Sequence, residues 1–191
     1  MKQTDTKTAI LDAAQDLIQR VGVNAMSYQH ISEAVGIRKA SIHHHFPTKE
    51  QLLDELIARY SRHFLGLVDD IMNSRVGPAT KLRRYAALFE ATLSEGQGDK
   101  ACLCGMLSAE VEALGSRAIE GLRRFSRENE RRVAQVLEEG RRRGELIFEG
   151  HARVLATLIF QLLEGSMLMA RADGGPKRFR AVIGQMMTLL R

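Results

Sequence analysis

The chain has little of what builds disulfide-stabilised, collagenous or disordered proteins. Its 191 residues contain two cysteines, three prolines and no tryptophan, while 45% of them are apolar. Two cysteines cannot form a disulfide framework, and an apolar share of this size is enough to build a real core. Because so few prolines interrupt the chain, its composition favours an all-helical protein.

Motifs that carry enzyme chemistry are also missing. The sequence has no Walker loop, no dinucleotide-binding glycine fingerprint, no metal-ligand spacing, and no ordered set of serine, histidine and aspartate. We therefore expect a protein that is not an enzyme and that needs no cofactor. The polar N-terminus does not resemble a signal peptide, and the apolar run Val154–Ala170 is short for a bilayer and interrupted by Gln161 and Glu164. We expect a cytoplasmic protein with no membrane partner.

Basic side chains outnumber acidic ones by 28 to 23, which gives a formal net charge of +5. Such an excess suggests a polyanionic partner. However, residues 1–63 carry eight Lys or Arg against seven Asp or Glu, and much of the excess lies in Arg123–Arg143. Glutamates alternate with these arginines, many of them four residues apart. This pattern favours a solvated, ion-paired helix face over a nucleic-acid patch.

Apolar residues recur at helical spacing along the whole chain. We expect a first helix that ends near Gly22, a short second helix with Ser27 as its N-cap, a third over about 38–45, and a long fourth helix capped by Thr48 and Gln51. Five more helices follow, at about 79–95, 101–114, 116–143, 149–172 and 176–190. The expected fold is all-α with about nine helices: an N-terminal three-helix module joined through the long fourth helix to a C-terminal helical domain.

Residues 31–50 read ISEAVGIRKASIHHHFPTKE. A helix, a glycine-containing turn and a second short helix is the arrangement that places a recognition helix in the major groove of DNA. The apolar residues that should fix the angle between the two helices are Ile31, Ala34, Ile37, Ile42 and Phe46. The polar residues of the third helix then face outward, where Arg and Lys can reach phosphates or guanine edges.

Residues 4–64 resemble the DNA-binding module of the TetR family of transcriptional regulators. The resemblance lies in ILDAAQDLI, ISEAVGI and KASIHHHFPTKEQLL, and it covers about a third of the chain. It implies a DNA-binding domain at 4–64, with a helix-turn-helix motif at about 27–46, and a helical ligand-binding and dimerisation domain at 65–191. It also implies a function: a sequence-specific repressor, released from a pseudo-palindromic double-stranded operator when a small-molecule effector binds.

The expected DNA contacts combine the outward face of the third helix with the positions that match the family. They are Ser27, Tyr28, Arg38, Lys39, Ala40, Ser41, His43, His44, His45 and Lys49. His43 stands where the family usually has Tyr, so its contact cannot be carried over. The three consecutive histidines do not predict a metal site, because successive helical residues point about 100° apart.

The expected helix at 149–172 is apolar nearly all round, which requires burial on more than one side. A homodimer built on this helix and the last one explains the pattern, since exposed apolar patches of this size are uncommon on soluble monomers. The expected interface residues are Leu158, Leu162, Gly165, Ser166, Ile183 and Met187.

The resemblance implies an effector cavity but does not locate it. The candidate lining residues are Phe89, Cys102, Met106, Phe125, Phe160, Glu164 and Met167. The apolar ones can equally be plain core, whereas Glu164 in an apolar helix needs a partner.

Two alternatives to a ligand-released repressor stay open. Cys102 and Cys104 are two positions apart, which disfavours an internal disulfide and favours two small side chains packed in a core helix. Some TetR-type regulators nevertheless sense electrophiles or oxidants through a cysteine in a similar helix. The other alternative is a constitutive DNA-binding repressor without a ligand.

Overall fold

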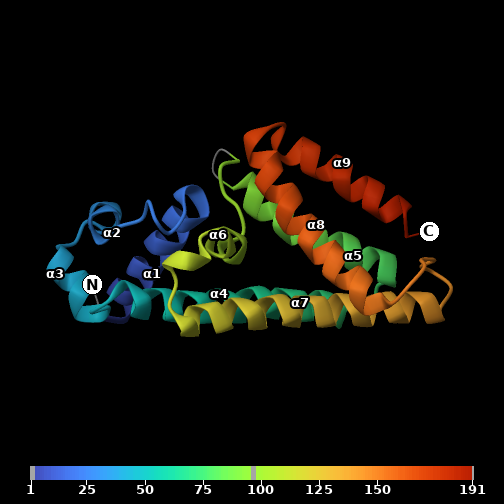
Figure 1. The fold of residues 1–191 in the computed structure, drawn as a ribbon, viewed down its shortest axis with the longest axis horizontal. Helices are drawn as coiled ribbons and strands as arrows, with labels where there is room; N and C mark the ends of the chain where they lie inside the picture. The colour runs from blue at the N-terminus through green and yellow to red at the C-terminus, as the bar shows by residue number, and fades with distance from the viewer. Residues whose placement is uncertain (1–2, 96–97, 191) are drawn as a thin grey trace. The chain divides into compact units, whose positions relative to one another are not determined.

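The computed structural model describes residues 3–95 and 98–190, and the regular structure of these residues is helical throughout (Figure 1). The elements are α1 (Gln3–Val21), α2 (Tyr28–Val35), α3 (Lys39–His45), α4 (Lys49–Met72), α5 (Pro78–Ser94), α6 (Leu103–Ala109), the 3₁₀ turn η1 (Val111–Ala113), α7 (Ser116–Arg142), α8 (Ala152–Ala172) and α9 (Gly175–Thr188). The all-α fold is confirmed.

The helices gather into two compact units. The N-terminal unit comprises the residues up to Ser61 together with Leu103–Arg123, and the C-terminal unit comprises Arg62–Cys102 and the residues from Arg124 on. Helices α4 and α7 are each continuous in sequence across this division. The DNA-binding module expected at 4–64 therefore shares its compact unit with a segment from much later in the chain.

In the N-terminal unit, α2 contacts both α1 and α3, and α6 contacts α1. Ile31, Ile42 and Phe46 are buried, as expected for the residues that set the angle between α2 and α3. The prediction for Ala34 is wrong because it is exposed, and Ile37 is only half-buried. The eight residues of α2 bury a single stripe, and Tyr28 and Ile31 fill it.

The turn between α2 and α3 depends on Gly36. Its backbone adopts the left-handed conformation, with φ of 73°, and its N–H donates to the Ser32 carbonyl. Glycine adopts this conformation without the penalty that a side chain would add. The Ser32 hydroxyl also donates to the Ile37 carbonyl at 2.5 Å, so the turn is held on both sides before α3 begins.

In the C-terminal unit, α5, α8 and α9 pack against one another, as Figure 1 shows in green, orange and red. Phenylalanine rings from α4, α5, α7 and α8 meet inside this unit: Phe64, Phe89, Phe125 and Phe160. All four rings are buried. These rings form part of the apolar core of the C-terminal unit.

Two helix boundaries differ from expectation. The helix expected at 101–114 covers only Leu103–Ala109, because Glu110 leaves the helical conformation and a 3₁₀ turn follows. Cys102 lies just before that helix, and its N–H points to the Met167 sulfur at 2.9 Å. Helix α8 begins at Ala152 rather than 149, after a glycine with positive φ at Gly150.

Helix α8 is long and apolar enough, by length and composition, to cross a membrane. One third of its most apolar window is buried inside the protein. A core helix of a soluble protein meets the same criterion, and α8 packs on α5 and α9 within its unit.

Candidate nucleic-acid interface and effector site

The outer face of α3 presents polar side chains to solvent. Arg38, Lys39, Ala40, His43 and His44 are exposed, while Ser41 and His45 are half-buried. On the opposite face, Ile42 is fully buried and Phe46 closes the end of the helix. The short helix is thus fixed by its apolar side, and its cationic residues are free to reach a ligand outside the protein.

Tyr28 connects α2 to the end of α3. Its hydroxyl donates to the Phe46 carbonyl at 2.9 Å, and its ring centroid lies 4.8 Å from that of His43. Burial raises the pKa of Tyr28 to about 12. The side chain acts as an internal brace, and a DNA contact by Tyr28 stays a prediction.

Two side chains cap the helices that flank the motif. The Ser27 hydroxyl accepts from the His30 N–H at 3.3 Å, which confirms it as the N-cap of α2. The Thr48 hydroxyl accepts from the Gln51 N–H at 3.2 Å at the start of α4. Each bond satisfies a backbone donor that the first turn of a helix leaves without a partner.

Lys49 is turned toward its own module. Its ammonium donates to the carbonyls of Val23 and Met26, at 2.6 and 2.8 Å. Burial lowers the pKa of Lys49, and the negative charge of Glu110 acts in the opposite direction. Two of its donors are therefore used inside the protein, and the phosphate contact expected of Lys49 stays a prediction.

Glu110 was not predicted to have a role, yet it contacts the turn between α1 and α2. One carboxylate oxygen accepts from the N–H groups of both Val23 and Asn24, and its distance to the Asn24 nitrogen is 3.2 Å. The residues lie more than 80 positions apart in the chain. No local pattern in the sequence signals such a contact, because it depends on how α6 packs on α1.

The effector candidates of the C-terminal unit gather around the phenylalanine rings. The Phe64 centroid lies 5.5 Å from that of Phe89 and 5.4 Å from that of Phe125. Phe160 lies 6.4 Å from Phe89 and 6.2 Å from Phe125. The structure thus brings three of the predicted residues into one cluster of rings, which also includes Phe64, a residue that was not among the candidates. Met106 differs from them, because it belongs to the N-terminal unit.

A buried carboxyl stands in the same unit. The Oε1 atom of Glu164 is inaccessible to solvent and makes no hydrogen bond within the described part of the chain, although some of the residue remains accessible. The pKa of Glu164 is raised well above its ordinary value, mainly by burial and to a smaller extent by the neighbouring Cys102. A buried polar atom without a partner destabilises the fold, and a ligand that donates a hydrogen bond would relieve this. Cys102 and Met167 are also buried.

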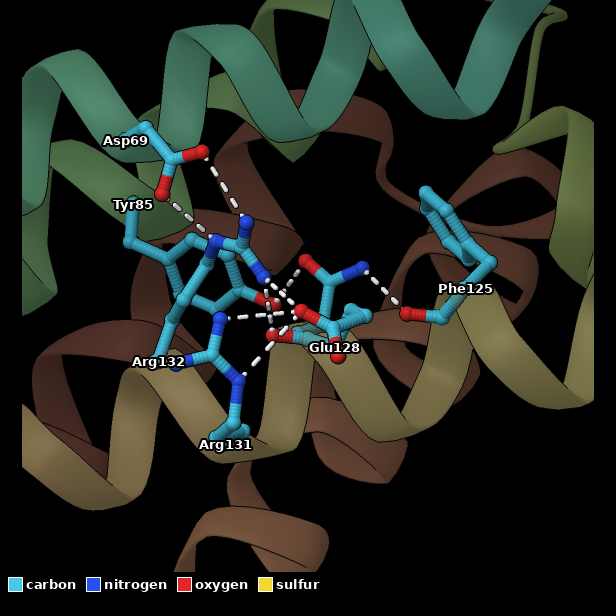
Figure 2. Close-up of polar contacts among 7 residues, drawn as sticks. Asp69, Tyr85, Phe125, Glu128, Arg131 and Arg132 are labelled. Carbon is cyan, nitrogen blue, oxygen red and sulfur yellow. Dashed lines mark hydrogen bonds and ion pairs between the residues drawn. The ribbon is translucent and has the colours of Figure 1, made fainter. Parts of the chain in front are cut away.

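Buried hydrogen bonds join Tyr85 to α7 in this unit, and sequence reasoning missed them. The Tyr85 hydroxyl donates to Asn129 Oδ1 at 3.0 Å, and the Asn129 amide donates to the Phe125 carbonyl at 2.9 Å (Figure 2). Burial raises the pKa of Tyr85 well above its ordinary value. This chain of bonds fixes the backbone beside the Phe125 ring.

The arginine-rich stretch of α7 makes ion pairs rather than presenting a continuous basic patch. Arg132 contacts Glu128 at 2.6 Å, four residues away, and also Asp69 of α4 at 2.7 Å (Figure 2). Arg131 and Arg143 pair with Glu128 and Glu139, at 2.9 and 3.0 Å. Ion pairing is confirmed for these residues, and a solvated face for Arg131 and Arg143, whereas the Arg132 side chain is only 11% exposed and packs toward α4.

An apolar surface remains on α8 and α9. Leu158 is 59% exposed, Leu189 70% exposed, and Gly165 is exposed. Leu158 and Leu189 belong to the lining of a groove of about 460 Å³, whose other apolar lining residues include Leu155, Leu162, Val182 and Met186. Of the other predicted interface residues, Leu162, Ser166 and Ile183 are half-buried. Met187 is buried within the protomer and offers little surface to a partner.

Comparison with known proteins agrees with this architecture. The family model described as bacterial regulatory proteins, tetR family, matches residues 10–56. The model described as tetracyclin repressor-like, C-terminal domain, matches residues 78–186, which is more than half of the chain.

Individual relatives match over most of their length. The crystal structure of a TetR family regulator from Agrobacterium tumefaciens has 32% sequence identity and a TM-score of 0.92, with 98% of each chain covered. The transcriptional regulator AcuR of Cereibacter sphaeroides is 25% identical over 88% of this chain and 77% of its own. The repressor DhaR of a Mycobacterium species is 24% identical over 100% of this chain and 92% of its own. The chain belongs to the TetR family of DNA-binding transcriptional repressors.

Proposed function

We propose that this repressor binds a pseudo-palindromic operator as a homodimer and that a small molecule bound in its C-terminal unit releases it. The observation that carries the proposal is the exposed basic face of α3, held from behind by buried Ile42 and Phe46. A protein of this kind acts on double-stranded DNA, in the cytoplasm, without a catalytic step.

Within the operator complex, α3 enters the major groove. Arg38 and Lys39 stand at its N-terminal end, the end that meets base edges in helix-turn-helix proteins. The other side chains of this face, and Ser27 at the start of α2, contact bases or backbone: Ala40, Ser41, His43, His44 and His45. Tyr28 and Lys49 support this face from inside the module, since their polar atoms bind backbone carbonyls.

The second copy of the chain covers the apolar surface of α8 and α9. Leu158 and Leu189 would be buried in a two-fold symmetric contact, and the exposed Gly165 lets the two α8 helices approach closely. Such a dimer presents two α3 helices to half-sites about one helical turn apart. The dimer is therefore the reason for expecting an operator with inverted symmetry.

The effector binds beside the phenylalanine rings and Glu164. A ligand with an apolar or aromatic body and a hydrogen-bond donor suits this environment, because it gives the buried Oε1 of Glu164 a partner. Release requires that the ligand bind one conformation better than the other. A shift from mostly bound to mostly released needs a preference of about 10⁴-fold. Helix α4, which carries both Lys49 and Phe64, is the element we propose to move.

Selection of duplexes from a random pool, followed by a thermal-shift screen of diverse compounds, tests this function. We expect one enriched inverted repeat, and compounds that raise the melting temperature while weakening binding to that repeat. Enrichment of no sequence would refute the operator. If compounds stabilise the protein but none weakens DNA binding, release by a ligand is refuted and a constitutive repressor is the remaining function.

The alternative to release by a bound small molecule is release by an electrophile or oxidant that reacts with a cysteine. Burial disfavours the thiolate of Cys102, which is the reactive form. We therefore expect N-ethylmaleimide to affect operator binding equally in the wild type and in the Cys102→Ser, Cys104→Ser double variant. Release of DNA by the wild type alone would establish thiol sensing instead.

A further inference from the structure

The turn between α1 and α2 needs partners from outside its own segment. Helix α1 ends at Val21, and the N–H of Gly22 still bonds to the Ile18 carbonyl. The next two N–H groups, those of Val23 and Asn24, belong to a turn in which Val23 and Gly22 are buried. The buried Val23 N–H requires an acceptor, because leaving it without one destabilises the fold, whereas Asn24 is exposed and its N–H can also bond to water.

Glu110 supplies that acceptor. Its Oε2 atom accepts both N–H groups, and bonds of this kind to a charged oxygen are stronger than neutral ones. Gly22 makes room for the carboxylate: a Cβ at this position would lie 2.7 Å from Oε2, and its φ of +85° is also a conformation that favours glycine. Gly22 and Glu110 are thus fitted to each other.

Lys49 binds backbone carbonyls of the same turn. The ammonium donates to the Val23 and Met26 carbonyls. The carboxylate of Glu110 thus binds N–H groups of the turn, and the ammonium of Lys49 binds its carbonyls. The charge of Glu110 also favours the protonated form of Lys49, since it acts to raise the pKa that burial lowers. The turn is fixed from both sides by side chains from α4 and from the segment after α6.

The turn between α1 and α2 positions the proposed DNA-binding face of α2 and α3. Ser27 follows it directly and begins α2, and Tyr28 next to it bonds to Phe46 at the end of α3. A displacement of the turn therefore shifts the start of α2 and, through the Tyr28 hydroxyl, the end of α3. Side chains must be held closely in place for base and phosphate contacts to form together.

We propose that Glu110 is a positioning residue for DNA binding, which holds the α1–α2 turn so that α2 and α3 keep the geometry that fits duplex DNA. Glu110 lies within the region matched by the C-terminal family model, yet it acts on the module matched by the N-terminal one. The inference rests on the DNA contacts proposed above for α2 and α3.

The direction in which Glu110→Ala changes DNA affinity distinguishes a positioning role from a simple effect of charge. Removing an acid near a DNA-binding face strengthens binding to a polyanion if charge alone matters, whereas loss of positioning weakens it. We expect Glu110→Ala to reduce affinity for the selected operator about tenfold, as the loss of charge-assisted bonds implies. Glu112→Ala removes the same charge two residues away, from an exposed side chain, and should bind as tightly as the wild type or slightly more tightly.

Amide hydrogen exchange shows whether the turn itself has changed. The Val23 and Asn24 amides should exchange faster in Glu110→Ala, with the oligomeric state and the amides of the C-terminal unit unchanged. Glu110→Gln keeps an acceptor oxygen and serves if the alanine variant does not fold; it should lose less affinity. An Arg38→Ala, Lys39→Ala variant tests the proposed DNA face on the same duplex. If that variant loses binding while Glu110→Ala binds as tightly as the wild type despite faster exchange at the turn, the positioning role is refuted and the DNA face stands.

Discussion

The guanidinium of Arg132 meets the carboxylate of Asp69 through two hydrogen bonds, Nε to Oδ1 at 2.7 Å and Nη2 to Oδ2 at 2.9 Å (Figure 2). The pair joins α7 to α4 inside the C-terminal unit, and a third nitrogen of Arg132 donates to Glu128. The Arg132 side chain is only 11% exposed, whereas that of Asp69 is 48% exposed. The bidentate geometry ties α7 to α4 at this point within the C-terminal unit.

Asp69→Asn should lower the free energy of unfolding by about 1 kcal/mol at neutral pH, a modest value because water screens the half-exposed carboxylate. Hydrogen bonds from Arg132 lower the pKa of Asp69 below its ordinary value of 3.8. The contribution is therefore complete above the unfolded-state pKa and disappears as pH falls through the lower folded-state pKa. Urea unfolding between about pH 2 and 6 measures this.

Asp70→Asn is the matched control for this variant, since Asp70 is the exposed neighbour on the same helix. It should unfold like the wild type at every pH. If Asp69→Asn and the wild type lose stability in parallel on acidification, the pair does not contribute to the acid sensitivity of the fold.

Arg38→Ala and Lys39→Ala should each weaken operator binding. A side chain that reads a guanine edge contributes about 1–3 kcal/mol and affects the selected sequence more than a random one. A side chain that contacts phosphate weakens both duplexes alike and reduces the salt dependence of binding. Titrations at several salt concentrations distinguish the two roles. Lys177→Ala removes an exposed charge from α9 and should leave both duplexes unaffected.

Leu158→Glu should convert the dimer into monomers, because it places a charge in the middle of the proposed apolar contact. Sedimentation at micromolar protein concentration measures the change. Val21→Glu introduces the same charge at another exposed apolar residue, on α1, and should remain dimeric. A Leu158→Glu protein that is still dimeric would move the interface away from this part of α8.

Glu164→Gln should change how stability depends on pH. Burial raises the folded-state pKa of Glu164, so ionisation of this carboxyl opposes folding: nothing is lost below the unfolded-state pKa, and stability falls as pH rises from there through the folded-state pKa. The glutamine variant lacks this loss, and its stability relative to the wild type should increase from about pH 4 to pH 7. Glu138→Gln, on the exposed face of α7, is the control. Parallel curves for Glu164→Gln and the wild type would mean that this carboxyl ionises normally in the folded protein.

Local patterns were sufficient to predict where the helices lie, but not the extent of α6 or the start of α8. The apolar periodicity, the caps at Ser27 and Thr48 and the glycine after α2 all act within a few residues, so they can be read along the chain. The same holds for the outward face of α3. Ala34 was assigned to the core because it is apolar and at the right spacing, but a helix of eight residues buries only one narrow stripe.

Contacts between distant segments were not predictable in this way. The sequence places Glu110 in an unremarkable acidic stretch, and only the packing of α6 on α1 brings its carboxylate to Val23. Tyr85 and Asn129 were missed for the same reason, since each looks like an ordinary helix residue until the two meet. Phe64 follows the helical apolar spacing of α4, but its place among the other rings depends on three helices at once.

The spacing of the two half-sites tests the central claim most directly. If a dimer aims two α3 helices at successive major grooves, inserting about half a helical turn of DNA between the half-sites of the selected operator puts the second half-site on the opposite side of the duplex. Binding of the intact protein to this duplex, measured by titration at moderate salt, should fall to the level of random DNA, and a single half-site should bind no better. Affinity that is unchanged by the insertion would contradict the account.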